Sequence, residues 1–278
     1  MTTAGPVDLL AFGPHPDDIE IGMGATVAKH AALGFRVGLC DLTRGELGSN
    51  GTPEERVAEG QAAAALLGAA WRVNLGLPDG GLTDIDSHVR AIVDLVRSAR
   101  PAAIAVPFAD DRHPDHRRAA VLLASAIFKA GLRRYPAPGA PWHAQWVCTY
   151  FINDSAPPSF VVDVSDVYDL KRRALACHAS QFRPVAPDAA DTRLTSPLFL
   201  QLVESRDAQF GAAAGVRFAQ EVAVGTFRRS VAAASPPLRQ PVAGDGGVGD
   251  VAAEGARAQA LLRAVRRCHR PPEVRPGR

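Results

Sequence analysis

Short apolar runs in this chain alternate with stretches in which apolar residues recur every three or four positions. A short apolar run bounded by turn residues is typical of a buried strand, and the longer spacing is typical of a helix with one buried face. The first half of the chain therefore predicts four strands, at residues 7–12, 35–42, 71–75 and 102–108. Helices are predicted after them, at residues 19–33, 52–67, 86–100 and 117–130. Strands and helices that alternate in this way favour parallel β-α-β units.

Two of the predicted helices carry start signals. Thr52 can cap the second helix, Pro53 suits its first turn, and Glu55 completes a capping box. Asp86 is expected to cap the third helix. The inner face of that helix is expected to carry four aliphatic residues, Val89, Ile92, Val93 and Val96.

The second half of the chain is less regular. Strand-like runs occur at residues 146–152 and 160–164, and helical patterns occur near residues 167–178 and 196–210. We therefore expect one α/β domain over residues 1–230, with a Rossmann-like, doubly wound, mostly parallel sheet. Residues 231–278 are rich in alanine, proline, glycine and arginine, which predicts a disordered tail.

Composition narrows the class of protein. The 278 residues are 47% hydrophobic, enough for one sizeable core. No apolar stretch approaches the roughly 18 to 20 residues of a membrane span, and no basic segment followed by an apolar one opens the chain, so we expect a soluble, cytoplasmic protein. The four cysteines lie far apart, which argues against a disulfide framework or a cysteine zinc site.

The net charge of +2 is unevenly distributed. Residues 231–278 hold eight arginines against four acidic residues, so the rest of the chain is slightly acidic. The charge therefore does not support a positively charged domain that binds nucleic acid.

Two polar loops follow predicted strands directly. The sequence His15-Pro16-Asp17-Asp18 follows the first strand, and His113-Pro114-Asp115-His116 follows the fourth. In a doubly wound sheet, ligands bind beyond the carboxyl ends of the strands, where the strand order reverses. If the first and fourth strands flank that point, the loops meet and bring three histidines and three aspartates together. Either loop alone is often only a turn with capping carboxylates.

These residue types suit a catalytic metal. Zinc in such a site takes about three protein ligands and leaves a position for water. His15, Asp18 and His116 are the expected ligands, and the same donors also suit Fe2+. Asp17 is then expected to act as the general base toward the water.

His113 remains as a second catalytic candidate. It lies two residues before Asp115, and we expect that carboxylate to hold it in the protonated form. An imidazolium there would stabilise an oxyanion or protonate a leaving nitrogen.

At these loops the chain resembles the LmbE/PIG-L-like family of metal-dependent N-acetylglucosamine deacetylases. That family has a His-Pro-Asp-Asp after the first strand and a His-x-Asp-His after a later one. The similarity runs over residues 9–227. The stretches DDIEIGMGAT, SNGT, NLGLPDGGL, DRHPDH and ASQF are similar to the subgroup that removes acetate from N-acetylglucosaminyl malate in bacillithiol biosynthesis. The resemblance implies the same metal ligands and the same base, with His113 and Asp115 stabilising the transition state.

The resemblance also implies substrate contacts. Arg56 and Arg112 match arginines that line the pocket in similar enzymes, where they could pair with the malyl carboxylates. Ser49 and Asn50 are expected either to bind sugar hydroxyls or to shape their loop. Leu202 stands where similar enzymes carry a tyrosine near the pocket.

The leading hypothesis is a cytoplasmic zinc amidohydrolase, a homo-oligomer like related enzymes, that deacetylates N-acetylglucosaminyl malate. It has a small-molecule glycoside as its partner and no nucleic-acid or membrane partner. Alternatives with the same chemistry act on an inositol-linked glucosamine, a mycothiol conjugate or a chitin-derived disaccharide. A non-catalytic sugar- or nucleotide-binding module is the third possibility, and the lack of a G-x-G-x-x-G after the first strand counts against it.

Overall fold

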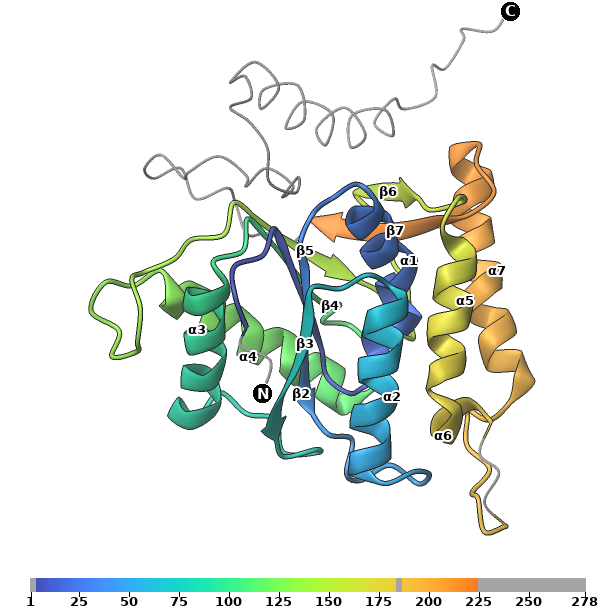
Figure 1. The fold of residues 1–278 in the computed structure, drawn as a ribbon, viewed down its shortest axis with the longest axis horizontal. Helices are drawn as coiled ribbons and strands as arrows, with labels where there is room; N and C mark the ends of the chain where they lie inside the picture. The colour runs from blue at the N-terminus through green and yellow to red at the C-terminus, as the bar shows by residue number, and fades with distance from the viewer. Residues whose placement is uncertain (1–3, 184–186, 225–278) are drawn as a thin grey trace, which may run out of the picture.

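The computed structural model describes residues 4–183 and 187–224, which form one sheet with helices on both faces (Figure 1). The strands are β1 (Leu9–Gly13), β2 (Val37–Thr43), β3 (Trp71–Leu77), β4 (Ala103–Pro107), β5 (Trp146–Tyr150), β6 (Phe160–Asp163) and β7 (Ala219–Val224). The helices are α1 (Asp18–Ala32), α2 (Pro53–Leu66), α3 (Asp86–Ala99), α4 (Pro114–Ala130), α5 (Tyr168–Cys177), α6 (Ala179–Phe182) and α7 (Pro197–Ala214).

The sheet has the strand order β3-β2-β1-β4-β5-β7-β6. Neighbouring strands from β3 to β5 are parallel, whereas β7 is antiparallel to both β5 and β6. The predicted Rossmann-like, mostly parallel sheet is confirmed. Strand β7 and the short helix α6 were not predicted.

Strands β1 and β4 are direct neighbours, with Leu9 opposite Ala103 and Ala11 opposite Ala105. The chain moves outward from β1 through β2 to β3 and then returns to the other side of β1. The strand order therefore reverses between β1 and β4, as expected. The loops that follow these two strands leave the sheet at the same place, which is where ligands bind in folds of this kind.

Apolar side chains cover both faces of the sheet. In β1, Leu9 and Ala11 pack into one core, and Leu10 and Phe12 pack into the other. This alternation follows from the two-residue period of a strand. Helices α1, α2 and α5 cover the first face, and α3 and α4 pack against each other on the second (Figure 1). The predicted inner face of α3 is fully buried.

The helix starts agree with the sequence only in part. The capping box of α2 is present, with reciprocal hydrogen bonds between Thr52 and Glu55. The prediction that Asp86 caps α3 was wrong, because Ile85 holds the cap position and Asp86 is the first helical residue. Helix α4 begins at Pro114, earlier than predicted, since a proline fits the first turn and the His113 side chain caps it. Asp115 and His116 are therefore helical residues.

Three further predictions concern membrane spans, the cysteines and the C-terminal tail. None of the helices in the described part combines the length and the apolar character required for a membrane span. Cys40, Cys148 and Cys177 are free thiols there. The predicted disordered tail, residues 231–278, lies outside the described residues.

Candidate metal centre

A pocket of about 560 Å³ opens beyond the carboxyl ends of β1 and β4. The ten predicted catalytic, metal and substrate residues all line it: His15, Asp17, Asp18, Ser49, Asn50, Arg56, Arg112, His113, Asp115 and His116. The two polar loops therefore meet as expected. The pocket also receives residues from the loops after β2, β3 and β5 and from the segment before α7.

Asp18 lies between two imidazoles. One carboxylate oxygen, Oδ2, is 3.1 Å from His15 Nδ1, and the other, Oδ1, is 3.3 Å from His116 Nε2. For metal–nitrogen distances of about 2.0–2.1 Å, ligand atoms on a tetrahedral ion lie about 3.3 Å apart. The distances from Asp18 to the two histidines therefore match the distance between neighbouring ligand atoms on a small divalent ion.

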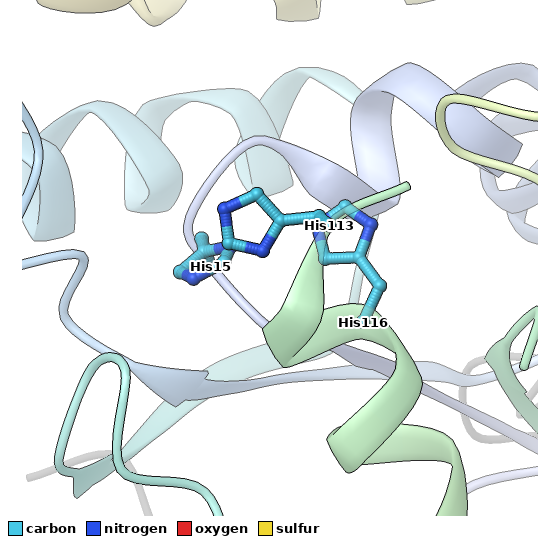
Figure 2. A group of neighbouring side chains, drawn as sticks. All are labelled: His15, His113 and His116. Atoms are coloured by element: carbon cyan, nitrogen blue, oxygen red, sulfur yellow. The ribbon is translucent and has the colours of Figure 1, made fainter. Parts of the chain in front are cut away.

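Two groups of three possible ligand atoms both include His15. Ring nitrogens of His15, His113 and His116 lie within 4.8 Å of one another, and Figure 2 shows the three imidazoles gathered at the first turn of α4. One ligand atom each from His15, Asp79 and Asp115 forms a second group within the same limit. His15 is therefore common to both groups of possible ligands.

The charges in the centre favour a cation. Burial opposes protonation of His15 and His116. Hydrogen bonds to Asp115, Asp18 and Asp79 nevertheless raise the pKa of His15 well above its usual value. The Asp18 charge and the Asp111 hydrogen bond raise the pKa of His116 to about 9, again against burial. A negative potential that stabilises a proton on an imidazole also stabilises a divalent ion, which displaces that proton. The donor set and the charge both fit zinc.

Asp17 adopts a strained backbone conformation, with φ of 124° directly before α1. Strain of this kind is kept where the surrounding structure holds a residue in a functional position. The side chain is buried, and its Oδ2 is 3.5 Å from Arg56 Nη2. Burial raises the pKa of Asp17 to about 6, although the Arg56 charge opposes this rise. A base with a pKa in that range can accept a proton near neutral pH.

His113 and Asp115 do not form the expected pair. The backbone N–H of Asp115 donates to His113 Nδ1 at 3.2 Å, whereas the Asp115 carboxylate accepts from Gly80 N at 2.7 Å and lies 3.5 Å from His15 Nε2. Burial, with the nearby histidine charges, lowers the pKa of His113. An imidazole that accepts at Nδ1 carries its proton on Nε2. His113 is therefore set up as a neutral Nε2–H donor instead of an imidazolium.

The two predicted substrate arginines differ in their surroundings. Arg56 is buried, and its guanidinium donates to the backbone oxygens of Gly45 and Pro16 at 3.0 and 3.1 Å. Gly45 has a positive φ of 67°, and a Cβ there would collide with that guanidinium, so both observations favour glycine. Arg112 is exposed at the pocket wall. Its backbone N–H donates to Asp154 at 2.6 Å, and its backbone oxygen accepts from Arg117 at 3.3 Å. Arg112 thus has the more accessible charge.

The two candidates of the loop after β2 also differ. The amide of Asn50 forms two hydrogen bonds with the backbone of Ala190, at 2.9 and 2.8 Å. This pairing supports the loop-shaping role that the sequence left open. Ser49 is exposed at the pocket. Leu202 is 49% exposed on α7 and does not line the pocket, whereas Phe199 does.

Several residues in or beside the pocket were missed in the sequence. Asp79 and Asn153 follow β3 and β5, and a polar residue directly after a parallel strand is a signal that would have found them. Asp111 lies within the DDRHPDH stretch and contacts His116. Arg193 comes from the segment before α7, and its Nη1 donates to Asn153 at 3.1 Å. Only the tertiary fold brings Arg193 to the pocket.

Comparisons with known proteins identify similar sequences and folds. Residues 10–127 match the family described as PIG-L, GlcNAc-PI de-N-acetylase. The diacetylchitobiose deacetylase of Thermococcus kodakarensis is 31% identical over 189 residues, which cover 63% of this chain and 70% of that protein. The 1D-myo-inositol 2-acetamido-2-deoxy-alpha-D-glucopyranoside deacetylase of Rhodococcus opacus is 29% identical over 253 residues, 68% of this chain and 86% of that protein.

Solved structures show the same fold. The conserved protein TT1542 from Thermus thermophilus superposes with a TM-score of 0.72 and 37% identity, over 79% of this chain and 94% of that one. The N,N'-diacetylchitobiose deacetylase from Pyrococcus horikoshii has a TM-score of 0.67 over 78% of this chain and 82% of its own, and at 22% identity it is a likeness of fold. The chain belongs to the LmbE/PIG-L family of N-acetylglucosamine deacetylases.

Proposed function

We propose that this protein is a zinc-dependent hydrolase that removes the acetyl group from an N-acetylglucosaminyl conjugate, with N-acetylglucosaminyl malate as its substrate. The observation that carries the proposal is the position of Asp18 between His15 and His116, with Asp17 beside it. His15, Asp18 and His116 would hold the metal, and Fe2+ suits the same donors. This choice leaves His113 outside the ligand set, although its ring also faces the other two.

Each side chain then has a separate task. When bound, the divalent ion supplies the Lewis acidity that activates a water molecule. Asp17 accepts the proton as the water oxygen bonds to the acetyl carbon, and the Nε2–H of His113 donates to the carbonyl oxygen as it becomes an oxyanion. The carbon–nitrogen bond breaks when the proton held by Asp17 passes to the departing nitrogen. The products are acetate and the free amine.

The pocket wall supports an acidic group on the sugar. Arg112 lies exposed at the wall, and the side chains of Arg118 and Arg193 line it too. Guanidinium groups bind carboxylates with two parallel hydrogen bonds, and a malyl group supplies two carboxylates. The malate conjugate is the substrate of the bacillithiol pathway that the sequence motifs suggested.

A second substrate has its own support. The relatives from Rhodococcus are named for the acetylated glucosaminyl inositol, and one of them aligns over 86% of its length. The inositol conjugate carries no charge on its aglycone and so would offer no acidic group to the exposed Arg112.

An assay of acetate release tests the metal dependence and the choice of substrate together. Metal-free protein, prepared with a chelator and reloaded with one equivalent of Zn2+, is assayed on the malate conjugate, the inositol conjugate and diacetylchitobiose. We expect no acetate without metal and the highest kcat/KM on the malate conjugate. A higher kcat/KM on the inositol conjugate would mean that this conjugate, and not the malate conjugate, is the substrate. Failure to release acetate from any of the three would contradict the proposed deacetylase activity.

A further inference from the structure

Each imidazole that faces Asp18 has a second carboxylate on its far side. His15 directs Nδ1 to Asp18 and Nε2 to Asp79 Oδ1, both at 3.1 Å. His116 directs Nε2 to Asp18 and Nδ1 to Asp111 Oδ1, at 3.3 and 3.1 Å. The two outer carboxylates lie outside the two tetrapeptide motifs, on the loops after β3 and β4.

Asp111 is held by four contacts and is only 3% exposed. Besides His116, its Oδ1 accepts from the His113 backbone at 2.8 Å and from Asn153 Nδ2 at 3.0 Å. Its Oδ2 accepts from the Asn153 backbone at 3.0 Å. Three of these four contacts do not involve His116, so the carboxylate cannot follow a rotating imidazole. It therefore determines the orientation of the His116 ring.

Asp79 is fixed in a similar way beside His15. Its Oδ2 accepts from the Leu47 backbone at 3.0 Å, and its own N–H donates to Glu46 at 3.0 Å. These bonds tie the loop after β3 to the loop after β2. The side chain of Asp79 is 8% exposed, so little water competes for it.

We propose that Asp111 and Asp79 are positioning residues that hold His116 and His15 by their outer ring nitrogens. The inference rests on the proposed metal centre. Asp111 accepts the Nδ1–H of His116, which leaves the Nε2 lone pair directed toward Asp18. Asp79 accepts the Nε2–H of His15, which leaves Nδ1 directed the same way. Carboxylates that bind a ligating histidine in this manner fix its tautomer and raise its basicity.

The test measures metal affinity directly. Asp111→Asn removes the charge at nearly constant volume, and Asp110→Asn makes the same change at the exposed neighbour. Zn2+ affinity is measured by competition with a chromophoric chelator on metal-free protein. Asp111→Asn should weaken binding by about 10- to 100-fold, the usual loss for an outer-shell partner, and Asp110→Asn should leave it unchanged. Equal affinity in Asp111→Asn and the wild type would overturn the proposal.

Further measurements separate positioning from folding. The absorption spectrum of the Co2+-loaded protein reports ligand geometry, so it should change in Asp111→Asn and stay constant in Asp110→Asn. The Tm of the metal-free Asp111→Asn protein should stay close to the wild type, and a large fall in Tm together with an unchanged spectrum would assign Asp111 a structural role. If Asp111→Asn does not fold, Asp79→Asn gives the same test at His15. A wild type that binds no Zn2+ would instead refute the proposed function.

Discussion

The guanidinium of Arg56, on α2, lies 3.5 Å from the carboxylate of Asp17, at the start of α1. Both side chains are buried, so the charge of one is felt strongly by the other. Arg56 lowers the pKa of Asp17 against the larger effect of burial. Arg56 is therefore placed to keep the proposed base ionised, which differs from the substrate-binding role expected from the sequence.

Arg56→Gln should move the acidic limb of the kcat/KM profile to higher pH. Without the guanidinium the pKa of Asp17 rises further, and the base is protonated over a wider pH range. At neutral pH kcat should fall by about tenfold or more, while Zn2+ content stays constant. Arg90→Gln, at an exposed site on α3, is the control. A pH profile that superimposes on the wild type would rule out this role for Arg56.

His116→Ala and His113→Ala distinguish the possible ligand sets. If His15, Asp18 and His116 hold the metal, His116→Ala loses it, whereas His113→Ala keeps about one equivalent and loses turnover by about 10²-fold or more. Elemental analysis after dialysis against metal-free buffer gives the result. Loss of the metal from His113→Ala would favour the three-histidine grouping instead.

Arg112→Gln should act on substrates with an acidic aglycone. One charge-assisted hydrogen bond contributes about 1.5–3 kcal/mol, so KM for the malate conjugate should rise by about 10- to 100-fold with kcat nearly constant. The KM for diacetylchitobiose, which has no carboxylate, should not change. Equal changes in KM for both substrates would mean that Arg112 supports the pocket wall and does not bind the acidic group of the substrate.

Arg72 is predicted to be important for stability. Its guanidinium is fully buried and binds Asp41 at 2.8 and 2.7 Å and Glu20 at 2.5 Å. Arg72→Ala would leave two buried carboxylates without their partner, which typically costs about 3–5 kcal/mol. Urea unfolding at pH 7 measures the loss, and Arg90→Ala should change the free energy of unfolding by less than about 0.5 kcal/mol. A loss of less than about 1 kcal/mol for Arg72→Ala would contradict this account of the network.

The sequence predicted the parallel half of the sheet well because its signals are local. The apolar runs of β1 to β4 are bounded by glycine, proline or polar turns, and the capping box of Thr52 and Glu55 marks α2 without any tertiary information. Strand β7 was missed because its residues, AQEVAV, carry a glutamine and a glutamate that are buried only in the folded protein. Gln220 accepts from Thr26 on α1, nearly 200 residues away.

In the candidate site, too, some features could be predicted from local sequence and others depend on the tertiary fold. Two tetrapeptides predicted which residues would meet, on the condition, met in the structure, that β1 and β4 flank the reversal of strand order. The partners of those residues could not be predicted. His113 and Asp115 are two residues apart, yet the helix that begins at Pro114 directs the Asp115 carboxylate toward Gly80 and His15. Sequence proximity suggested a pair that the helical backbone separates.

Asp17→Asn tests the central claim most directly. Asparagine tolerates the positive φ of this position, keeps the volume of the side chain and cannot accept the proton. Acetate release and bound Zn2+ are measured on the same preparation. The account predicts about one equivalent of Zn2+ and a kcat lower by about 10²- to 10⁴-fold, the contribution of a general base. A variant that keeps both its Zn2+ and its wild-type kcat would contradict it.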